Sequence, residues 1–166
     1  MEEHEIKTDV NQYEVDSIYQ LKIDPAIKDL LHISIDSYFQ NRAKDPENCS
    51  YGPLALLGPS GCGKSLIAKA VHKTLLNQHL IEANGESLNS IPEMISALMT
   101  ATNETSIFID EAQALNVKVQ HVLLTAISEK IIYAPRKNAK GKFAIPLANF
   151  TLILASTHEF QLQDAL

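Results

Sequence analysis

Residues 54–65 read LALLGPSGCGKS, an apolar run followed by a glycine-rich loop that ends in lysine and serine. The loop, residues 58–65, matches the pattern G-x-x-x-x-G-K-[ST]. In this pattern the glycines let backbone N–H groups turn inward around phosphate. A helix that opens directly after the loop adds its positive end to the same site. The stretch therefore predicts a strand, a phosphate-binding loop and a helix, in that order.

The loop also predicts how a nucleotide would be held. Lys64 would reach the β- and γ-phosphates of ATP, and the Ser65 hydroxyl would bind Mg²⁺. Cys62 stands at a variable position and is interpreted as a filler, because nothing nearby suggests a partner base. We expect the loop and the residue after it to bind the nucleotide: Gly58, Pro59, Ser60, Gly61, Cys62, Gly63, Lys64, Ser65 and Leu66.

A second apolar run ends in two acidic residues, in the stretch IFIDE at 107–111. A strand here would deliver Asp110 to the carboxyl edge of the sheet, beside the phosphate loop. Asp110 is then predicted to hold Mg²⁺ indirectly, by contact with the groups that bind the ion, or through water. Glu111 is predicted to orient and polarise the attacking water as a general base. Strands often end in acidic residues. The roles predicted for Asp110 and Glu111 therefore depend on the phosphate loop that precedes this strand in the sequence.

A third apolar run, TLILA at 151–155, is followed by Ser156 and Thr157. A hydroxyl at this point could sit between the acidic pair and the γ-phosphate, where it would help to position water and report the state of the nucleotide. The alternative is a hydroxyl that only caps the end of the strand.

The hydrophobic pattern alternates between helices and strands along the chain. Strands that alternate with helices favour a parallel sheet covered on both faces. We expect an α/β fold, the three-layer sandwich of P-loop NTPases, with a β-hairpin insertion. The pattern predicts helices over 25–39, 64–76, 91–99 and 115–130, strands over 54–57, 80–83, 107–109 and 151–155, a loop over 41–53 and the hairpin over 130–147.

Length, charge and cysteine content narrow the class of protein. The 166 residues suit one domain, over residues 15–166, after a charged and flexible tail at 1–14. A net charge of −6 argues against a protein that is basic overall and binds polyanions across its surface. Two cysteines give no zinc spacing and no disulfide framework. With no signal peptide and no membrane-spanning run, we expect a cytoplasmic protein.

Together these segments resemble AAA+ ATPases, and within them the RuvB family of Holliday junction branch-migration motors. The family's phosphate loop and acidic strand are general to P-loop ATPases, whereas its sensor strand is more discriminating. The chain departs from the family at Tyr19, where glycine is usual, at Ala112 and Gln113, where Ile-His is common, and at His158, where arginine is common. The segments that carry the likeness are VDSIYQ (15–20), LLGPSGCGKSLIAKAV (56–71), SIFIDEAQALNVKVQHVLLTAISE (106–129), AIPLANFTLILAST (144–157) and QLQDAL (161–166).

The resemblance implies further roles. It selects Thr157 rather than Ser156 as the γ-phosphate sensor, and it places Ile18 in the adenine pocket. It implies ATP hydrolysis by a ring of subunits, in DNA recombination and repair. It also implies that Leu166 precedes the family's arginine finger, helical lid and DNA-binding winged helix, so the chain alone is expected to bind ATP and hydrolyse it slowly.

Two other functions stay open. One is a nucleotide-binding switch or interaction module that does not hydrolyse ATP. The other is an AAA+ ATPase of the clamp-loader or remodelling type, although residues 84–104 lack the aromatic residue of a remodeller's pore loop.

The predicted hairpin at 130–147 has three readings. In the RuvB family the corresponding hairpin meets the partner protein RuvA, so one hypothesis is a RuvA-like protein partner. Direct contact with DNA phosphates is the second hypothesis. A solvated hairpin without a partner is the third reading. The charges that raise the question are Lys130, Arg136, Lys137, Lys140 and Lys142, with no acidic residue among them.

Overall fold

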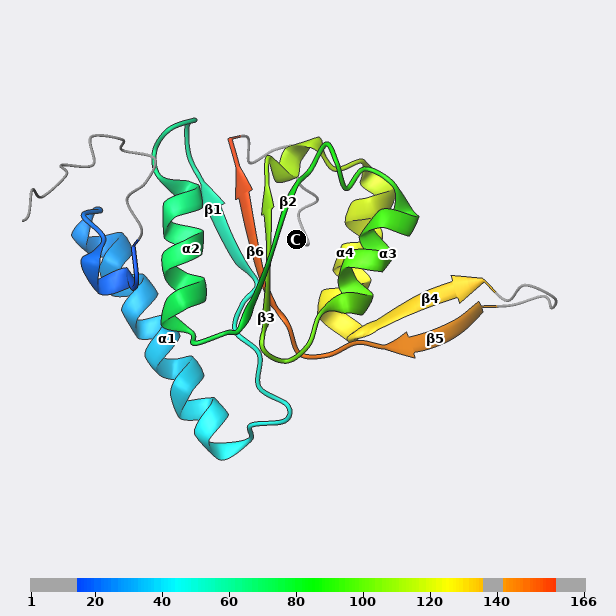
Figure 1. The fold of residues 1–166 in the computed structure, drawn as a ribbon, viewed down its shortest axis with the longest axis horizontal. Helices are drawn as coiled ribbons and strands as arrows, with labels where there is room; N and C mark the ends of the chain where they lie inside the picture. The colour runs from blue at the N-terminus through cyan, green and yellow to red at the C-terminus, as the bar shows by residue number, and fades with distance from the viewer. Residues whose placement is uncertain (1–14, 136–141, 158–166) are drawn as a thin grey trace, which may run out of the picture.

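The computed structural model describes residues 15–135 and 142–157, so the predicted tail at 1–14 lies outside the described residues. Four parallel strands form one sheet in the order β1-β6-β3-β2, with helices on both faces (Figure 1). This arrangement confirms the predicted three-layer α/β fold. The strands of the sheet are β1 (Leu54–Leu57), β2 (His79–Asn84), β3 (Thr105–Asp110) and β6 (Thr151–Ser156). The helices are the 3₁₀ turns η2 (Ile18–Gln20) and η3 (Ala112–Ala114), and α1 (Pro25–Lys44), α2 (Lys64–Thr74), α3 (Ile91–Thr100) and α4 (Val117–Glu129).

The two central strands are buried on both faces, because alternate side chains enter different cores. Ile107 and Ile109 of β3 pack with the core beneath α3 and α4. Phe108, between them, packs with the core beneath α1 and α2. Side chains of a strand point alternately to the two faces of a sheet, so an unbroken apolar run is what a doubly covered strand requires.

Strand β6 lies between β1 and β3, although it is the last strand along the sequence among the described residues. Ala55 of β1 pairs with Leu154, and Phe108 of β3 pairs with Ile153 on the other edge of β6. The phosphate loop and the acidic strand end are therefore not on neighbouring strands. The carboxyl end of β6 stands between them.

Helix ends follow local chemistry. The Asp24 side chain accepts a hydrogen bond from the Ala26 N–H, as an N-cap does. Ser90 and Glu93 form a capping box at the start of α3. The predicted loop at 41–53 begins too early, because α1 continues to Lys44. It stops ahead of Asp45, which precedes Pro46 and so disfavours the helical conformation.

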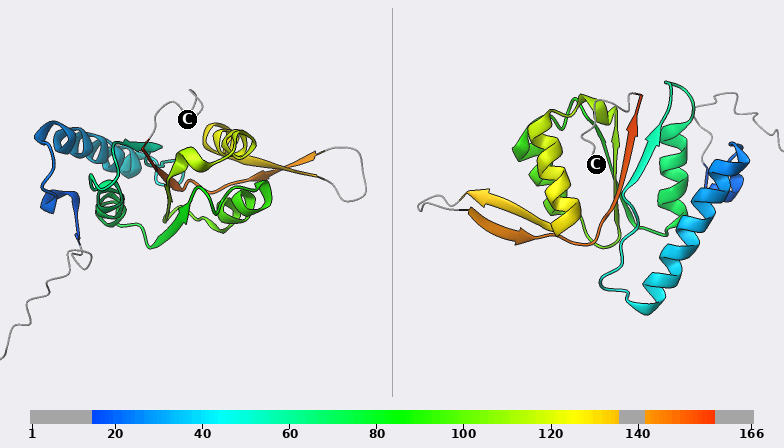
Figure 2. Two further views of the ribbon diagram at one scale, coloured as in Figure 1. Left: turned by 90° about the horizontal axis from the view of Figure 1, so that it is seen from above. Right: turned by 180° about the vertical axis from the view of Figure 1, so that it is seen from behind.

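The hairpin is formed by β4 (Ile131–Pro135) and β5 (Lys142–Pro146), paired antiparallel. It extends away from the sheet and its helices, as both views of Figure 2 show. Its base is joined to the body by the Leu147 N–H, which donates to the Lys130 carbonyl at 2.8 Å. Within the part of the chain that the structure describes, no helix is long and apolar enough to cross a membrane.

Candidate nucleotide-binding site

The phosphate loop joins the carboxyl end of β1 to the first turn of α2, as its motif predicts. Gly63 is the N-cap of α2, with φ 93°, and Gly61 has φ 77°. These left-handed conformations strain any residue with a Cβ, so the motif's glycines are needed here. The Gly58 N–H donates to the Ser156 carbonyl at 3.2 Å, which ties the loop to the end of β6.

Lys64 bends back over the loop. Its Nζ donates to the carbonyls of Gly58 and Pro59, at 2.8 and 3.0 Å. The residue is 8% exposed, which is unusual for lysine. Two carbonyl oxygens satisfy part of the ammonium's hydrogen-bonding capacity, and its third proton remains to bind an anion in the loop.

The acidic end of β3 reaches the same place. Ser65 Oγ donates to Asp110 Oδ2 at 3.1 Å, across 45 residues of sequence. The other carboxylate oxygen of Asp110 accepts from the Glu111 N–H at 2.9 Å. The structure thus brings together the two residues predicted to hold Mg²⁺.

These residues surround a hollow of about 230 Å³. A larger hollow, of about 630 Å³, lies between α1 and β1 and contains none of the predicted site residues. The chemistry therefore points to the smaller one, at the mouth of the loop, which is lined by Ser60, Gly61, Gly63, Lys64, Ser65, Leu66, Asp110 and Glu111.

Glu111 has a backbone conformation that is rare for a residue with a side chain, φ 50° and ψ 45°. Its carbonyl accepts from the Ala114 N–H at 2.8 Å, which closes the turn η3. Gly85 packs against it so closely that a Cβ added there would lie 2.3 Å from the Glu111 carbonyl oxygen. Sequence reasoning missed Gly85, whose only signal is the Asn84-Gly85 pair at the end of β2.

Thr157 and Glu111 are both bound by the side chain of Gln113. Gln113 Nε2 donates to the Glu111 carboxylate and, at 3.0 Å, to Thr157 Oγ1. Gln113 Oε1 accepts from the Thr157 N–H at 3.3 Å. The sequence singled out Gln113 only as a departure from a family pattern, and nothing local in it signalled this bridge.

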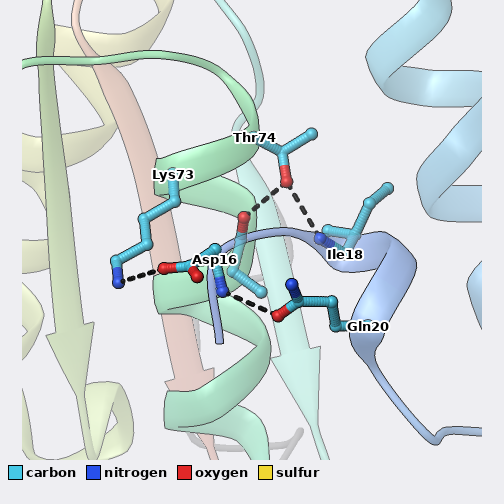
Figure 3. Close-up of polar contacts among 6 residues, drawn as sticks. Asp16, Ile18, Gln20, Lys73 and Thr74 are labelled. Atoms are coloured by element: carbon cyan, nitrogen blue, oxygen red, sulfur yellow. Dashed lines mark hydrogen bonds and ion pairs between the residues drawn. The ribbon is translucent and has the colours of Figure 1, made fainter. Parts of the chain in front are cut away.

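Ile18, the residue that the resemblance places in the adenine pocket, lies beside Thr74 at the C-terminal end of α2. Its side chain is fully buried in the core beneath α1 and α2, and its N–H donates to Thr74 Oγ1 at 2.9 Å (Figure 3). Thr74 stands ten residues after Lys64 on α2, a rise of about 15 Å. The structure therefore does not bring Ile18 together with the phosphate loop. Its neighbour Tyr19 is 58% exposed and packs its ring against that of His32, with the ring centroids 4.7 Å apart.

A phosphate loop that opens a helix, with a carboxylate from another parallel strand bound to its serine, is the arrangement of a P-loop NTPase. Residues 54–166 match the model of the ATPase family associated with various cellular activities (AAA), and the chain belongs to this family.

Several RuvB proteins are similar to this chain. The chain is 28% identical over 133 residues to the Holliday junction branch migration complex subunit RuvB of Phytoplasma mali, covering 79% of this chain and 38% of that protein. RuvB of Mesomycoplasma hyopneumoniae is 30% identical over 119 residues, or 68% and 36% of the two chains. A solved structure, the Thermotoga maritima RuvB Holliday junction branch migration motor, superposes with a TM-score of 0.72 at 20% identity, over 92% of this chain and 44% of that one. The chain thus spans less than half the length of these relatives.

Proposed function

We propose that the chain is the ATP-binding domain of a RuvB-like AAA ATPase that hydrolyses ATP when its subunits assemble, in DNA recombination and repair. The observation that carries the proposal is the hydrogen bond between Ser65 and Asp110 at the mouth of the phosphate loop. This pair joins the first turn of α2 to the end of β3, and it supplies oxygen ligands for a magnesium nucleotide. The printed names of the relatives suggest the DNA role.

The Ser65–Asp110 pair fits Mg²⁺. Two ligands at right angles around this ion lie roughly 3.0 Å apart, which follows from bond lengths near 2.1 Å, and the two oxygens are 3.1 Å apart. The described residues hold no cluster of three or more His, Cys, Asp or Glu that would form a metal cage of protein ligands alone. Mg²⁺ commonly binds through one or two protein ligands, water and phosphate, and when bound it would neutralise phosphate charge.

The remaining residues have distinct tasks. Loop N–H groups and Lys64 bind the phosphates, and the low exposure of Lys64 strengthens its attraction to them. Glu111 accepts a proton from water as the water attacks the γ-phosphate. Thr157 donates its hydroxyl hydrogen to a γ-phosphate oxygen.

Transition-state charge needs a further cation, which an arginine supplies in many P-loop NTPases. Arg42 is the one arginine among residues 15–135 and 142–157, and its guanidinium is bound to the Tyr38 hydroxyl on α1. We propose that a neighbouring subunit supplies this cation, so that a single subunit hydrolyses ATP slowly and assembly raises the rate.

Calorimetry with Mg-ATP and Mg-ADP tests the binding step. We expect Lys64→Ala to weaken ATP binding by about 1.5–3 kcal/mol, the range for hydrogen bonds to charged groups. Lys69→Ala is the matched control, because Lys69 lies on the same helix but pairs with Glu82 at the surface. Equal affinity in wild type and Lys64→Ala would contradict the proposal.

Phosphate release at saturating ATP tests the catalytic step. We expect wild-type turnover well below about one per second, the low end of typical enzymes, and a further loss in Glu111→Gln. Rapid wild-type turnover would show that no neighbouring subunit is needed.

The hairpin is proposed as the docking site for a protein partner similar to RuvA. Tyr133 and Phe143 are 47% and 41% exposed, and they lie on opposite faces of the hairpin, because Tyr133 pairs with Ala144 and Phe143 pairs with Ala134. Each face of the hairpin therefore offers an exposed aromatic ring to a partner. Beside Tyr133 is a hollow of about 280 Å³, lined also by Ile91 and Ile95. We expect Tyr133→Ser with Phe143→Ser to abolish binding of purified RuvA without changing ATP binding. A steep salt dependence of DNA binding by the isolated chain would favour phosphate contact instead.

A further inference from the structure

The amide of Gln113 joins the ends of two strands that are separated by more than 40 residues of sequence. It donates to the Glu111 carboxylate beyond β3 and exchanges two hydrogen bonds with Thr157 beyond β6, at 3.0 and 3.3 Å. A carboxylate only accepts hydrogen bonds, so the amide nitrogen has to face Glu111. The oxygen of the same amide then faces Thr157 and accepts from its N–H.

We propose that Gln113 is a positioning residue that couples γ-phosphate recognition at Thr157 to water activation at Glu111. The inference rests on the proposed function, because it assumes those two roles. Gln113 occupies an acceptor site on Thr157 Oγ1, which directs the hydroxyl hydrogen away from Gln113 and leaves it free for a phosphate oxygen. The same amide restrains the Glu111 carboxylate, so a displacement of Thr157 is passed to Glu111 through one rigid planar group.

A purely structural role for Gln113 makes different demands. The turn η3 is already closed by backbone hydrogen bonds from Ala114 and Leu115. If Gln113 only stabilised this turn, its loss would lower the stability of the protein and weaken the binding of all nucleotides to the same extent. Coupling instead predicts an effect confined to nucleotides that carry a γ-phosphate.

The first experiment measures the affinities of Mg-ADP and of a non-hydrolysable ATP analogue by calorimetry. We expect Gln113→Ala to lower the affinity for the analogue about fivefold or more. Its affinity for ADP should stay within twofold of wild type. In Gln113→His one ring nitrogen can donate while the other accepts, so this variant should recover part of the preference for the analogue. Gln78→Ala is the control, since Gln78 is an exposed glutamine remote from this hydrogen-bonded group.

A double-mutant cycle with Thr157→Val tests whether the two residues act together. If Gln113 acts through Thr157, the double variant binds the analogue no more weakly than the more affected single variant, because coupled residues are not additive. Additive losses would overturn the inference.

The outcomes separate this inference from the function on which it rests. If wild type binds nucleotide but the analogue-to-ADP ratio is unchanged in Gln113→Ala, the coupling is overturned and the nucleotide site stands. If wild type binds neither nucleotide, the proposed function fails and the coupling fails with it.

Discussion

Strands β3 and β6 carry polar side chains at both ends, and the two ends differ. At the amino end, Ser106 accepts from Asn77 Nδ2 at 2.9 Å and shares a hydrogen bond of 3.0 Å with the His72 ring. Asn77 also donates to Thr151 at 3.3 Å, which links this group to β6. Asn77, Ser106 and Thr151 are all buried.

At the carboxyl end, Asp110, Glu111 and Thr157 are only partly buried, and the first two line an open hollow. Polar groups that bond to one another inside the protein hold strands together, whereas groups that keep free capacity beside a hollow can take a ligand. Position on a strand, and not polarity, therefore separates structural hydrogen bonds from those available for chemistry.

The largest expected loss of stability is at the amino end. Ser106→Ala removes the hydroxyl shared by His72 and Asn77, whose Oδ1 is already without a partner. Leaving buried groups unsatisfied costs about 1–3 kcal/mol each, so we expect a loss of about 2–3 kcal/mol in urea denaturation. Nucleotide affinity should not change, and Ser128→Ala, at an exposed helix position, should have little effect on either. A large fall in nucleotide affinity for Ser106→Ala would show that the polar groups at the amino end are not purely structural.

Gly85→Ala should lower both the stability of the protein and its rate of ATP hydrolysis. The new Cβ would meet the backbone of Glu111, which cannot move as a side chain end could. Overpacking of this kind lowers the free energy of unfolding by about 1–3 kcal/mol. Because Glu111 is displaced, the protein should also hydrolyse ATP more slowly. Denaturation and single-turnover hydrolysis together measure the two effects, with exposed Glu86→Ala as the control. Normal hydrolysis in a destabilised Gly85→Ala would show that the turn tolerates displacement.

Ser65→Ala should leave stability within about 0.5 kcal/mol, as substitutions outside the core do. Its hydroxyl meets only Asp110, which keeps a second partner in the Glu111 N–H. We expect the variant to lose most of the gain in ATP affinity that Mg²⁺ provides over EDTA in wild type. A loss of stability above about 1 kcal/mol, with no change in the magnesium dependence of ATP affinity, would show that the Ser65–Asp110 pair is structural.

The smallest effect is a pH dependence at the amino end. Burial, with a smaller contribution from the Lys73 charge, holds the pKa of His72 below its usual 6.5, and Glu82 opposes the shift. The unfolded chain then takes up a proton at a pH where the folded protein does not. Stability is therefore fully present above about pH 6.5 and falls as the pH drops toward the folded-state pKa. Between pH 5 and 8 the denaturation midpoint should depend less on pH in His72→Gln than in wild type. An identical dependence in the two proteins would show that His72 does not contribute to it.

Much of the fold was readable from the sequence because each strand is a short apolar run bounded by turn residues. The strands at 54–57 and 151–155 were predicted to within a residue of β1 and β6. The last turn of α1 was missed because its residues, Asn41 to Lys44, carry no apolar period. Arg42 is half-buried and donates to the Tyr38 hydroxyl one turn earlier, whereas Ala43 and Lys44 are exposed and favour helix through intrinsic propensity.

The candidate site was only partly readable. The loop and the two carboxylates belong to contiguous motifs, so their meeting could be expected once a parallel sheet was inferred. Gly85 and Gln113 act through contacts between segments that no single motif joins. The position of β6 between β1 and β3 is also a property of strand order, which local patterning does not specify.

That position has a consequence for how the chain is made. During synthesis β1, β2 and β3 emerge before β6, and β1 has no partner in the sheet until β6 arrives. The loop and its acidic counterpart are then held on separate, incomplete parts of the protein, each with unpaired strand edges. Pairings between segments so distant along the chain slow folding, because the chain entropy is lost before the contacts form. A ribosome that pauses before residue 151 would therefore expose edges prone to aggregation.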